Sequence, residues 1–199
     1  MTTILLTGFN PFAGDARNPS GEIASRLDGI RIGGALVRGV VLPTAYDAAA
    51  EQLRVLLDEH RPDVVLCLGM AVGRSAITPE RIAINLDDAA IADNAGDIRR
   101  DSPIEPGGPD GRFSRLAVHA IADAVAAVGI PAAVSLSAGA FVCNHVFYTL
   151  LGLTSGTAVR AGFIHVPALP DAARPEAPAM DLDTMVRGVT IALETILAS

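Results

Sequence analysis

Apolar residues along the chain fall into two patterns that alternate with each other. Short continuous apolar runs are typical of strands buried on both faces, and they cover residues 2–8, 36–42, 63–69, 132–136 and 161–166. Elsewhere, apolar side chains recur with helical spacing over residues 19–27, 46–60, 113–128, 142–151 and 182–197. Residues 81–86 alternate between apolar and polar side chains and predict a strand nearer an edge.

The residues between these segments support the same boundaries. Asn18 stands where a helix N-cap is expected, and Gly129 with Pro131 closes the helix predicted over 113–128. Strands that alternate with helices predict an α/β fold, namely a single-domain three-layer α/β/α sandwich over residues 1–199 with a largely parallel, mixed central sheet. In such sheets, ligand sites lie at the carboxyl ends of the strands.

One long stretch, residues 95–111, is irregular and rich in proline and glycine. A loop of this length in a compact domain is typical of a lid, a binding loop or an oligomer contact. Residues 8–14 match neither the Walker spacing nor the GxGxxG spacing, so the sequence does not indicate nucleotide binding.

Composition narrows the partners and the compartment. A chain of 199 residues with a formal net charge of −7 argues against nucleic acid or an anionic membrane as a partner. Its two cysteines, Cys67 and Cys143, do not make a disulfide scaffold and favour a reducing compartment. The sequence shows no signal-peptide pattern and no apolar run that could span a bilayer, so we expect a cytoplasmic protein.

Cys143 is the strongest candidate for chemistry. It follows a stretch of small residues and opens a predicted helix, where the positive end of the helix dipole favours a thiolate. Cys67, in the middle of a continuous strand, is expected to be a core residue.

A nucleophilic cysteine needs a base and an acid that orients the base. His145 lies two residues beyond Cys143 on one helix, faces another side, and is predicted to be a surface or packing residue. His165 ends a predicted strand and is the preferred base, with Glu80 as the orienting acid and Asp87 and Asp88 as its rivals. The chain has no HExxH motif and no paired cysteines or histidines at ligand spacing, so we expect no metal and no cofactor.

Several ordered motifs resemble the pyroglutamyl peptidase I (pyrrolidone-carboxylate peptidase) family nearly from end to end. The opening TGFNPFAG at residues 7–14 is followed by Asn18-Pro19-Ser20. A glutamate segment at 78–88, a cysteine segment at 137–144 and the histidine segment GFIHVP at 162–167 come in the family's order.

The resemblance implies an open α/β/α fold and a metal-independent cysteine exopeptidase that removes pyroglutamate from peptide amino termini. It implies that Cys143 is the nucleophile, His165 the acid/base and Glu80 the orienting carboxylate. Family members are typically cytoplasmic and often tetrameric, so a homo-oligomer is expected. The positions that match the family's lactam pocket are Phe9, Phe12, Thr44, Met70, Ile91, Phe141 and Val142.

The chain departs from the family pattern at three positions. Met70 stands where many members carry glutamine, Ala90 where many carry arginine, and Ala168 where tyrosine is common. Ala90 favours a competing hypothesis, a pyroglutamyl-binding protein without catalysis, whereas retention of the catalytic residues favours the peptidase. A third hypothesis is a different amidase that uses the same cysteine, histidine and glutamate.

Overall fold

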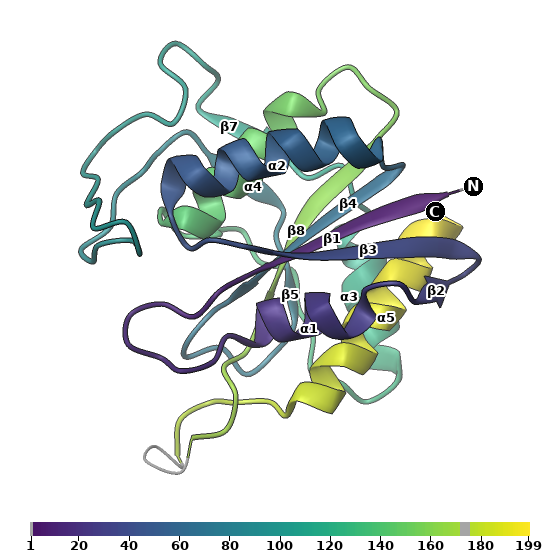
Figure 1. Ribbon diagram of the computed structural model, residues 1–199. Coiled ribbons are helices and arrows are strands. Elements are labelled where there is room, and N and C mark those ends of the chain that lie inside the picture. Colours follow the sequence, from purple (N-terminus) through teal and green to yellow (C-terminus); the bar gives the residue numbers. More distant parts are fainter. Residues whose placement is uncertain (1, 172–175) are drawn as a thin grey trace.

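The computed structural model describes residues 2–171 and 176–199. Its centre is a six-stranded sheet with the order β2-β3-β1-β4-β8-β5 (Figure 1). Those strands are β1 (Thr3–Phe9), β2 (Arg31–Ile32), β3 (Ala35–Leu42), β4 (Val64–Met70), β5 (Thr78–Pro79) and β8 (Arg160–Val166). The four inner strands are parallel, whereas β2 and β5 run antiparallel to their neighbours. The predicted mixed, largely parallel sheet is confirmed.

Helices cover both faces of this sheet, which confirms the three predicted layers. Figure 1 shows α2 and α4 on one face and α1, α3 and α5 on the other. Their bounds are α1 (Pro19–Leu27), α2 (Tyr46–His60), α3 (Val118–Ala127), α4 (Val142–Leu153) and α5 (Leu182–Ala198). Asn18 caps α1 as predicted, because its side chain accepts a hydrogen bond of 3.1 Å from the Ser20 N–H.

The continuous apolar runs follow from burial on both faces. Along β1, Ile4 and Leu6 join the core under α1, α3 and α5, whereas Leu5 and Phe9 join the core under α2 and α4. Because successive side chains of a strand point to opposite faces, a strand covered on both sides must be apolar at nearly every position.

The prediction of a strand over residues 132–136 is wrong. This segment makes only isolated bridges, from Ala132 to Ile77 and from Ser135 to Glu80. The Ser135 hydroxyl donates to the main-chain oxygen of Ser137 at 3.2 Å, and such local bonds compete with a regular strand ladder.

The helix predicted over residues 113–128 begins later than expected. The helix α3 starts only at Val118, and the first residue of the predicted range, Phe113, belongs instead to β7 (Gly111–Phe113). This strand pairs with β6 (Ile82–Ile84) in a separate two-stranded sheet. The strand expected within residues 81–86 therefore exists, but it does not join the central sheet. Helical spacing of apolar residues carries no information about this pairing with a distant segment.

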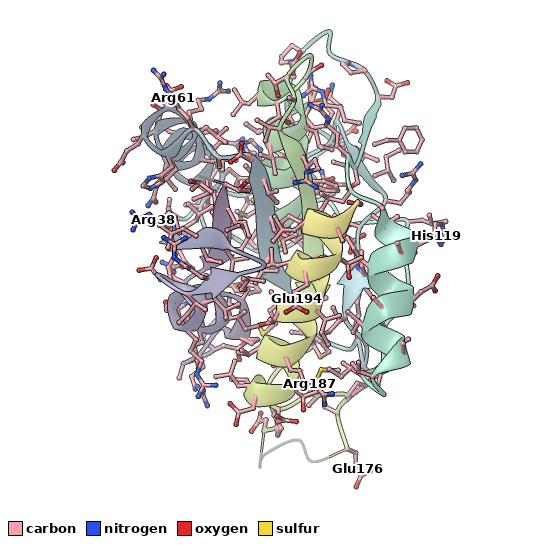
Figure 2. The ribbon with its side chains drawn as sticks, turned by 90° about the vertical axis from the view of Figure 1, so that its right-hand side faces the viewer. Arg38, Arg61, His119, Glu176, Arg187 and Glu194 are labelled. Atoms are coloured by element: carbon pink, nitrogen blue, oxygen red, sulfur yellow. The ribbon has the colours of Figure 1, made fainter. Side chains whose placement is uncertain are left out.

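The outer sides of the helices are polar. Figure 2 shows His119 on α3 and Arg187 and Glu194 on α5 turned away from the sheet. In the part of the chain that the structure describes, no helix has both the length and the apolar character needed to cross a membrane.

Close packing of α1 on β1 depends on the absence of a side chain at Gly8. A β-carbon at Gly8 would lie 2.0 Å from the main-chain oxygen of Ser20 in α1. The contact also aligns the Ser20 hydroxyl, which accepts a 3.0 Å hydrogen bond from the Phe9 N–H. This pair of contacts joins the end of β1 to the helix after the loop at residues 10–18.

Replacing Gly8 with alanine is expected to lower the free energy of unfolding by about 1–3 kcal/mol, because a helix main chain cannot give way as a flexible side chain can. Urea denaturation of the G8A variant measures the effect. The matched control is Gly152→Ala, where the atoms nearest to the new methyl group belong to the side chain of Arg112 and not to a main chain. An equal effect of both variants would contradict the close-packing explanation.

Candidate active site

Three segments meet at the carboxyl ends of β4 and β8. Gly69 and His165 lie directly opposite each other in this parallel pair, and Thr78 of β5 is the partner of His165 on its other side. Glu80 follows β5, and its N–H donates to the main-chain oxygen of Phe163 at 2.9 Å. The sheet therefore brings residues 69, 80 and 165 together from three parts of the sequence.

The imidazole of His165 is held by Glu80. His165 Nδ1 lies 2.8 Å from Glu80 Oε1, and the Glu80 side chain is 0% exposed. A carboxylate only accepts hydrogen bonds, so Nδ1 carries the proton and Nε2 is the nitrogen left to exchange a proton. The predicted base and orienting acid thus form a pair with the required geometry.

Cys143 faces the same space from α4. A β-carbon built on Gly69 would lie 2.8 Å from Cys143 Sγ and 3.0 Å from His165 Cδ2. The missing side chain at Gly69 therefore leaves the room in which the sulfur and the imidazole meet. Cys143 lies in the first turn of α4, whose N–H groups have no partner within the helix.

Burial controls the protonation of this pair. Burial and the negative charge of Glu80 raise the pKa of the Cys143 thiol to about 12. Burial also lowers the pKa of His165, although Glu80 opposes that shift. The free site therefore holds a neutral thiol beside a neutral imidazole. Burial thus opposes the thiolate that the position of Cys143 at the start of a helix was predicted to favour.

Glu80 stays charged in the same surroundings. Burial raises its pKa, but hydrogen bonds from His165, Ser135 and Arg74 outweigh this effect and hold the pKa below its usual range. The site thus combines an ionised acid with an uncharged base, which is the arrangement that lets His165 accept a proton.

Aromatic side chains form a wall next to Cys143. Phe141, the N-cap residue of α4, has its ring 5.9 Å from that of Phe12 and 5.5 Å from that of Tyr46, measured between centroids. Phe9 packs 6.5 Å from Phe163, whose ring lies 4.9 Å from the imidazole of His165. Three of these rings, Phe9, Phe12 and Phe141, are at positions predicted for the pocket. Phe163 lies in the predicted histidine segment at 162–167.

The other residues predicted to line the pocket differ in their burial and in their hydrogen bonds. Phe9 and Val142 are buried in the core, whereas the Ile91 side chain is 47% exposed. Thr44 ties two loops together, since its N–H and hydroxyl donate to Asn10 and its main-chain oxygen accepts from Asn94.

The Met70 side chain points away from Cys143. Gly69 faces Cys143, and successive positions of a strand face opposite sides of the sheet. The Met70 side chain instead lines a cavity of about 340 Å³ with residues that include Pro19, Val72, Ala168 and Leu169. The Met70 side chain is therefore directed to a different space from the one that Cys143 borders.

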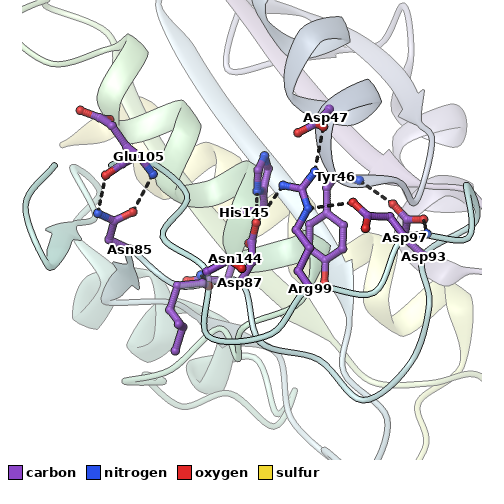
Figure 3. A network of polar contacts seen from close by, with 12 residues as sticks. Tyr46, Asp47, Asn85, Asp87, Asp93, Asp97, Arg99, Glu105, Asn144 and His145 are labelled. Carbon is purple, nitrogen blue, oxygen red and sulfur yellow. Dashed lines mark hydrogen bonds and ion pairs between the residues drawn. The ribbon is translucent and has the colours of Figure 1, made fainter. Parts of the chain in front are cut away.

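His145 belongs to a separate buried network (Figure 3). Its Nδ1 lies 2.9 Å from Asp87 Oδ2, and the same oxygen accepts from Arg99 at 3.0 Å. Arg99 also binds Asp47 and Asp97 and lies 4.5 Å above the Tyr46 ring. His145 is thus a packing residue, as one predicted alternative held, and it is not at the surface.

This network settles which acid serves which histidine. Asp87 is paired with His145 and not with His165, and Asp88 lies 3.6 Å from Arg100. Neither rival of Glu80 therefore contacts the predicted base in the structure.

Two contributors to the site were missed by sequence reasoning. Arg74 binds Glu80, and Tyr46 supports Phe141, but an arginine in a loop and a tyrosine at a helix start carry no signal of such contacts.

Comparison with known proteins agrees with this geometry. The sequence profile described as pyroglutamyl peptidase matches residues 2–199. The chain belongs to the pyroglutamyl peptidase family. A pyrrolidone-carboxylate peptidase of Gloeobacter violaceus is 50% identical over 196 residues, which cover 97% of this chain and 96% of that protein. The pyrrolidone-carboxylate peptidase of Bacillus subtilis is 45% identical over 195 residues, covering 96% and 91% of the two chains.

Solved structures of pyroglutamyl peptidases share the fold. The crystal structure of pyroglutamyl peptidase I from Bacillus amyloliquefaciens superposes with a TM-score of 0.96 at 40% identity, covering 100% of this chain and 96% of the other. A mutant pyrrolidone carboxyl peptidase from Pyrococcus furiosus has a TM-score of 0.95 at 41% identity and 99% coverage of both chains. The family resemblance and the fold class inferred from the sequence are confirmed.

Alkylation with iodoacetamide is expected to distinguish the two cysteines of this pyroglutamyl peptidase family member. Cys143 borders the site and should react in the native protein, whereas Cys67 is fully buried and should not. The H165A variant should label Cys143 about tenfold more slowly or worse, because no base remains to accept the thiol proton. Peptide mapping measures both rates. Equal labelling of Cys143 in both proteins would remove His165 from thiol activation.

The network around Asp87 should contribute to stability. Arg99→Met leaves the buried carboxylate of Asp87 without its arginine and is expected to lower the free energy of unfolding by about 3 kcal/mol. Urea denaturation gives the value. The control is Arg26→Gln, which removes an exposed ion pair with Asp183 and should cost less than about 1 kcal/mol.

Proposed function

We propose that this protein is a cysteine exopeptidase that removes amino-terminal pyroglutamate from peptides by acyl transfer through a thioester. The observation that carries the proposal is the convergence of Cys143 Sγ, the His165 imidazole and the Glu80 carboxylate over Gly69. Membership of the pyroglutamyl peptidase family supports the same substrate and the same three roles.

In the first step, Nε2 of His165 takes the proton of the Cys143 thiol as the sulfur attacks the pyroglutamyl carbonyl carbon. The carbonyl oxygen becomes an oxyanion, and we assign its stabilisation to the N–H groups in the first turn of α4, the turn that carries Cys143. One such donor contributes about 3 kcal/mol in other hydrolases. Glu80 stabilises the imidazolium that forms, because its carboxylate accepts the Nδ1–H hydrogen bond.

The intermediate then collapses. His165 gives its new proton to the leaving amine, the carbon–nitrogen bond breaks, and pyroglutamate remains attached to Cys143 as a thioester. A water molecule loses a proton to Nε2 and attacks this thioester, and the proton returns to the departing sulfur. Pyroglutamate is released as a free acid, and the thiol and neutral imidazole are restored.

The aromatic wall supports selectivity for a lactam. Phe12 and Phe141 offer an apolar surface beside the nucleophile. A neutral, compact ring loses little on leaving water there, whereas a charged terminal ammonium without a partner would lose much more. We assign to the lactam pocket the rings of Phe9, Phe12 and Phe141, the side chains of Ile91 and Val142, the main chain of residue 70, and Thr44 as the anchor of its loops.

The proposal also covers the domain organisation, the oligomeric state and the cellular compartment of the protein. We infer one catalytic domain over residues 1–199 and a homo-oligomer in the cytoplasm, which the two free thiols and the family's usual assembly support. Light scattering of the purified protein tests the oligomer.

Replacing Cys143 with alanine should abolish release of the fluorophore from a pyroglutamyl amide, because no other group can form the thioester. Glu80→Gln should retain more activity than the C143A variant, since His165 keeps a hydrogen-bond acceptor but loses the adjacent charge. Initial rates with a pyroglutamyl fluorogenic amide measure both effects.

The matched control is Cys67→Ala, which removes the core thiol and should leave turnover near that of the unchanged protein. Turnover by C143A would contradict the mechanism, and equal rates on glutaminyl amides would contradict a lactam pocket. A natural-sequence protein that binds a pyroglutamyl peptide but never cleaves it would support the binding-protein hypothesis that Ala90 favours.

A further inference from the structure

Arg74 occupies the turn that follows β4 and reaches back into the site. Its N–H donates to the main-chain oxygen of Ala71 at 3.2 Å, and Gly73 adopts a φ of 88° to complete the turn. The Arg74 side chain is 30% exposed, so its guanidinium lies at the boundary between the solvent and the buried acid.

The guanidinium shares one carboxylate oxygen with the catalytic histidine. Arg74 Nη1 lies 2.7 Å from Glu80 Oε1, the atom that also accepts from His165 Nδ1 at 2.8 Å. The same nitrogen donates to Thr78 Oγ1 at 2.6 Å, and the Thr78 hydroxyl lies 3.3 Å from the main-chain oxygen of His165. The Glu80 carboxylate is therefore held by two partners, His165 and Arg74.

A second arm of Arg74 reaches the segment before the nucleophile. Nη2 donates to the main-chain oxygen of Ser137 at 2.9 Å. The Ser137 hydroxyl in turn accepts from the Gly139 N–H at 3.2 Å, and this turn leads directly into the start of α4 and Cys143. One guanidinium thus connects Glu80 to the segment that precedes Cys143. Glu80 and Cys143 are more than sixty residues apart in the sequence.

We propose that Arg74 is a positioning residue of the peptidase reaction, which holds the Glu80 carboxylate in place behind His165 and ties it to the turn before Cys143. The inference rests on the proposed function, because it names a further residue for that same reaction. Arg74 does not touch the reacting atoms in this arrangement and acts through Glu80.

Charge gives Arg74 an effect that simple packing would not have. The titratable groups facing Glu80 are Arg74, His165 and Cys143. Arg74 lowers the pKa of Glu80 through its hydrogen bond, and its positive charge adds to the burial that lowers the pKa of His165. Removing the guanidinium therefore raises both pKa values, so both groups become protonated at higher pH. Because Glu80 and His165 are joined by a hydrogen bond, their titrations are coupled and the shift is a property of the pair.

Arg74→Gln is the decisive variant. The kcat for a pyroglutamyl fluorogenic amide should fall by about tenfold to a hundredfold, since a displaced catalytic group loses rate on this scale. The KM should change little, because the lactam pocket is untouched. The acidic limb of the pH profile of kcat/KM should move to higher pH, as active enzyme needs ionised Glu80 and neutral His165.

Arg74→Lys should restore part of the rate and the position of the acidic limb, because a lysine keeps the charge but not the paired arms of the guanidinium. Arg26→Gln, which removes an exposed arginine of α1, is the matched control and should change neither measurement. Circular dichroism and a thermal melt establish that each variant is folded before its rates are compared.

An Arg74→Gln protein that is folded and keeps the original kcat and acidic limb would overturn the inference while leaving the proposed function intact. A reduced kcat with an unmoved acidic limb, and no gain on introducing lysine, would also overturn it, because that outcome indicates only a structural role. Failure of the unchanged protein to release pyroglutamate would instead contradict the proposed function.

Discussion

The contact between Glu80 and His165 is the constraint on which the site depends. It is a buried pairing of a carboxylate with an imidazole, and burying either group alone would cost several kcal/mol. The sheet makes the contact possible, since β5 runs antiparallel beside β8 and delivers residue 80 next to residue 165. A short edge strand of two residues therefore matters more for the chemistry than its length suggests.

The two faces of the sheet differ in the residues that they carry. The face under α1, α3 and α5 is an apolar core, whereas the face under α2 and α4 carries Cys67, Phe163 and the reacting groups at its end. Strand alternation sends Gly69 and Met70 to opposite faces, so one position makes room for the sulfur and the next lines a different cavity.

Polar networks hold the loops that surround the reacting groups. Arg99 binds three acids and stacks on Tyr46, which in turn supports the Phe141 ring beside the nucleophile. The irregular stretch between residues 95 and 111 is thereby attached to α2 and α4 through charged groups (Figure 3). His145 belongs to this support, which explains why a histidine so near Cys143 in sequence takes no part in its chemistry.

The sequence by itself determined the sheet-and-helix architecture, the cap at Asn18, and the three residues at the centre of the site. It could do so because burial on two faces imposes continuous apolar runs, and because the motifs around Cys143, His165 and Glu80 resemble one family. Tertiary structure alone decided the pairing of β6 with β7, the partners of Asp87, the place of Arg74, and the raised pKa of the Cys143 thiol. Each of these depends on contacts between distant segments and on the loss of solvent around them, and local patterns of residues do not encode either.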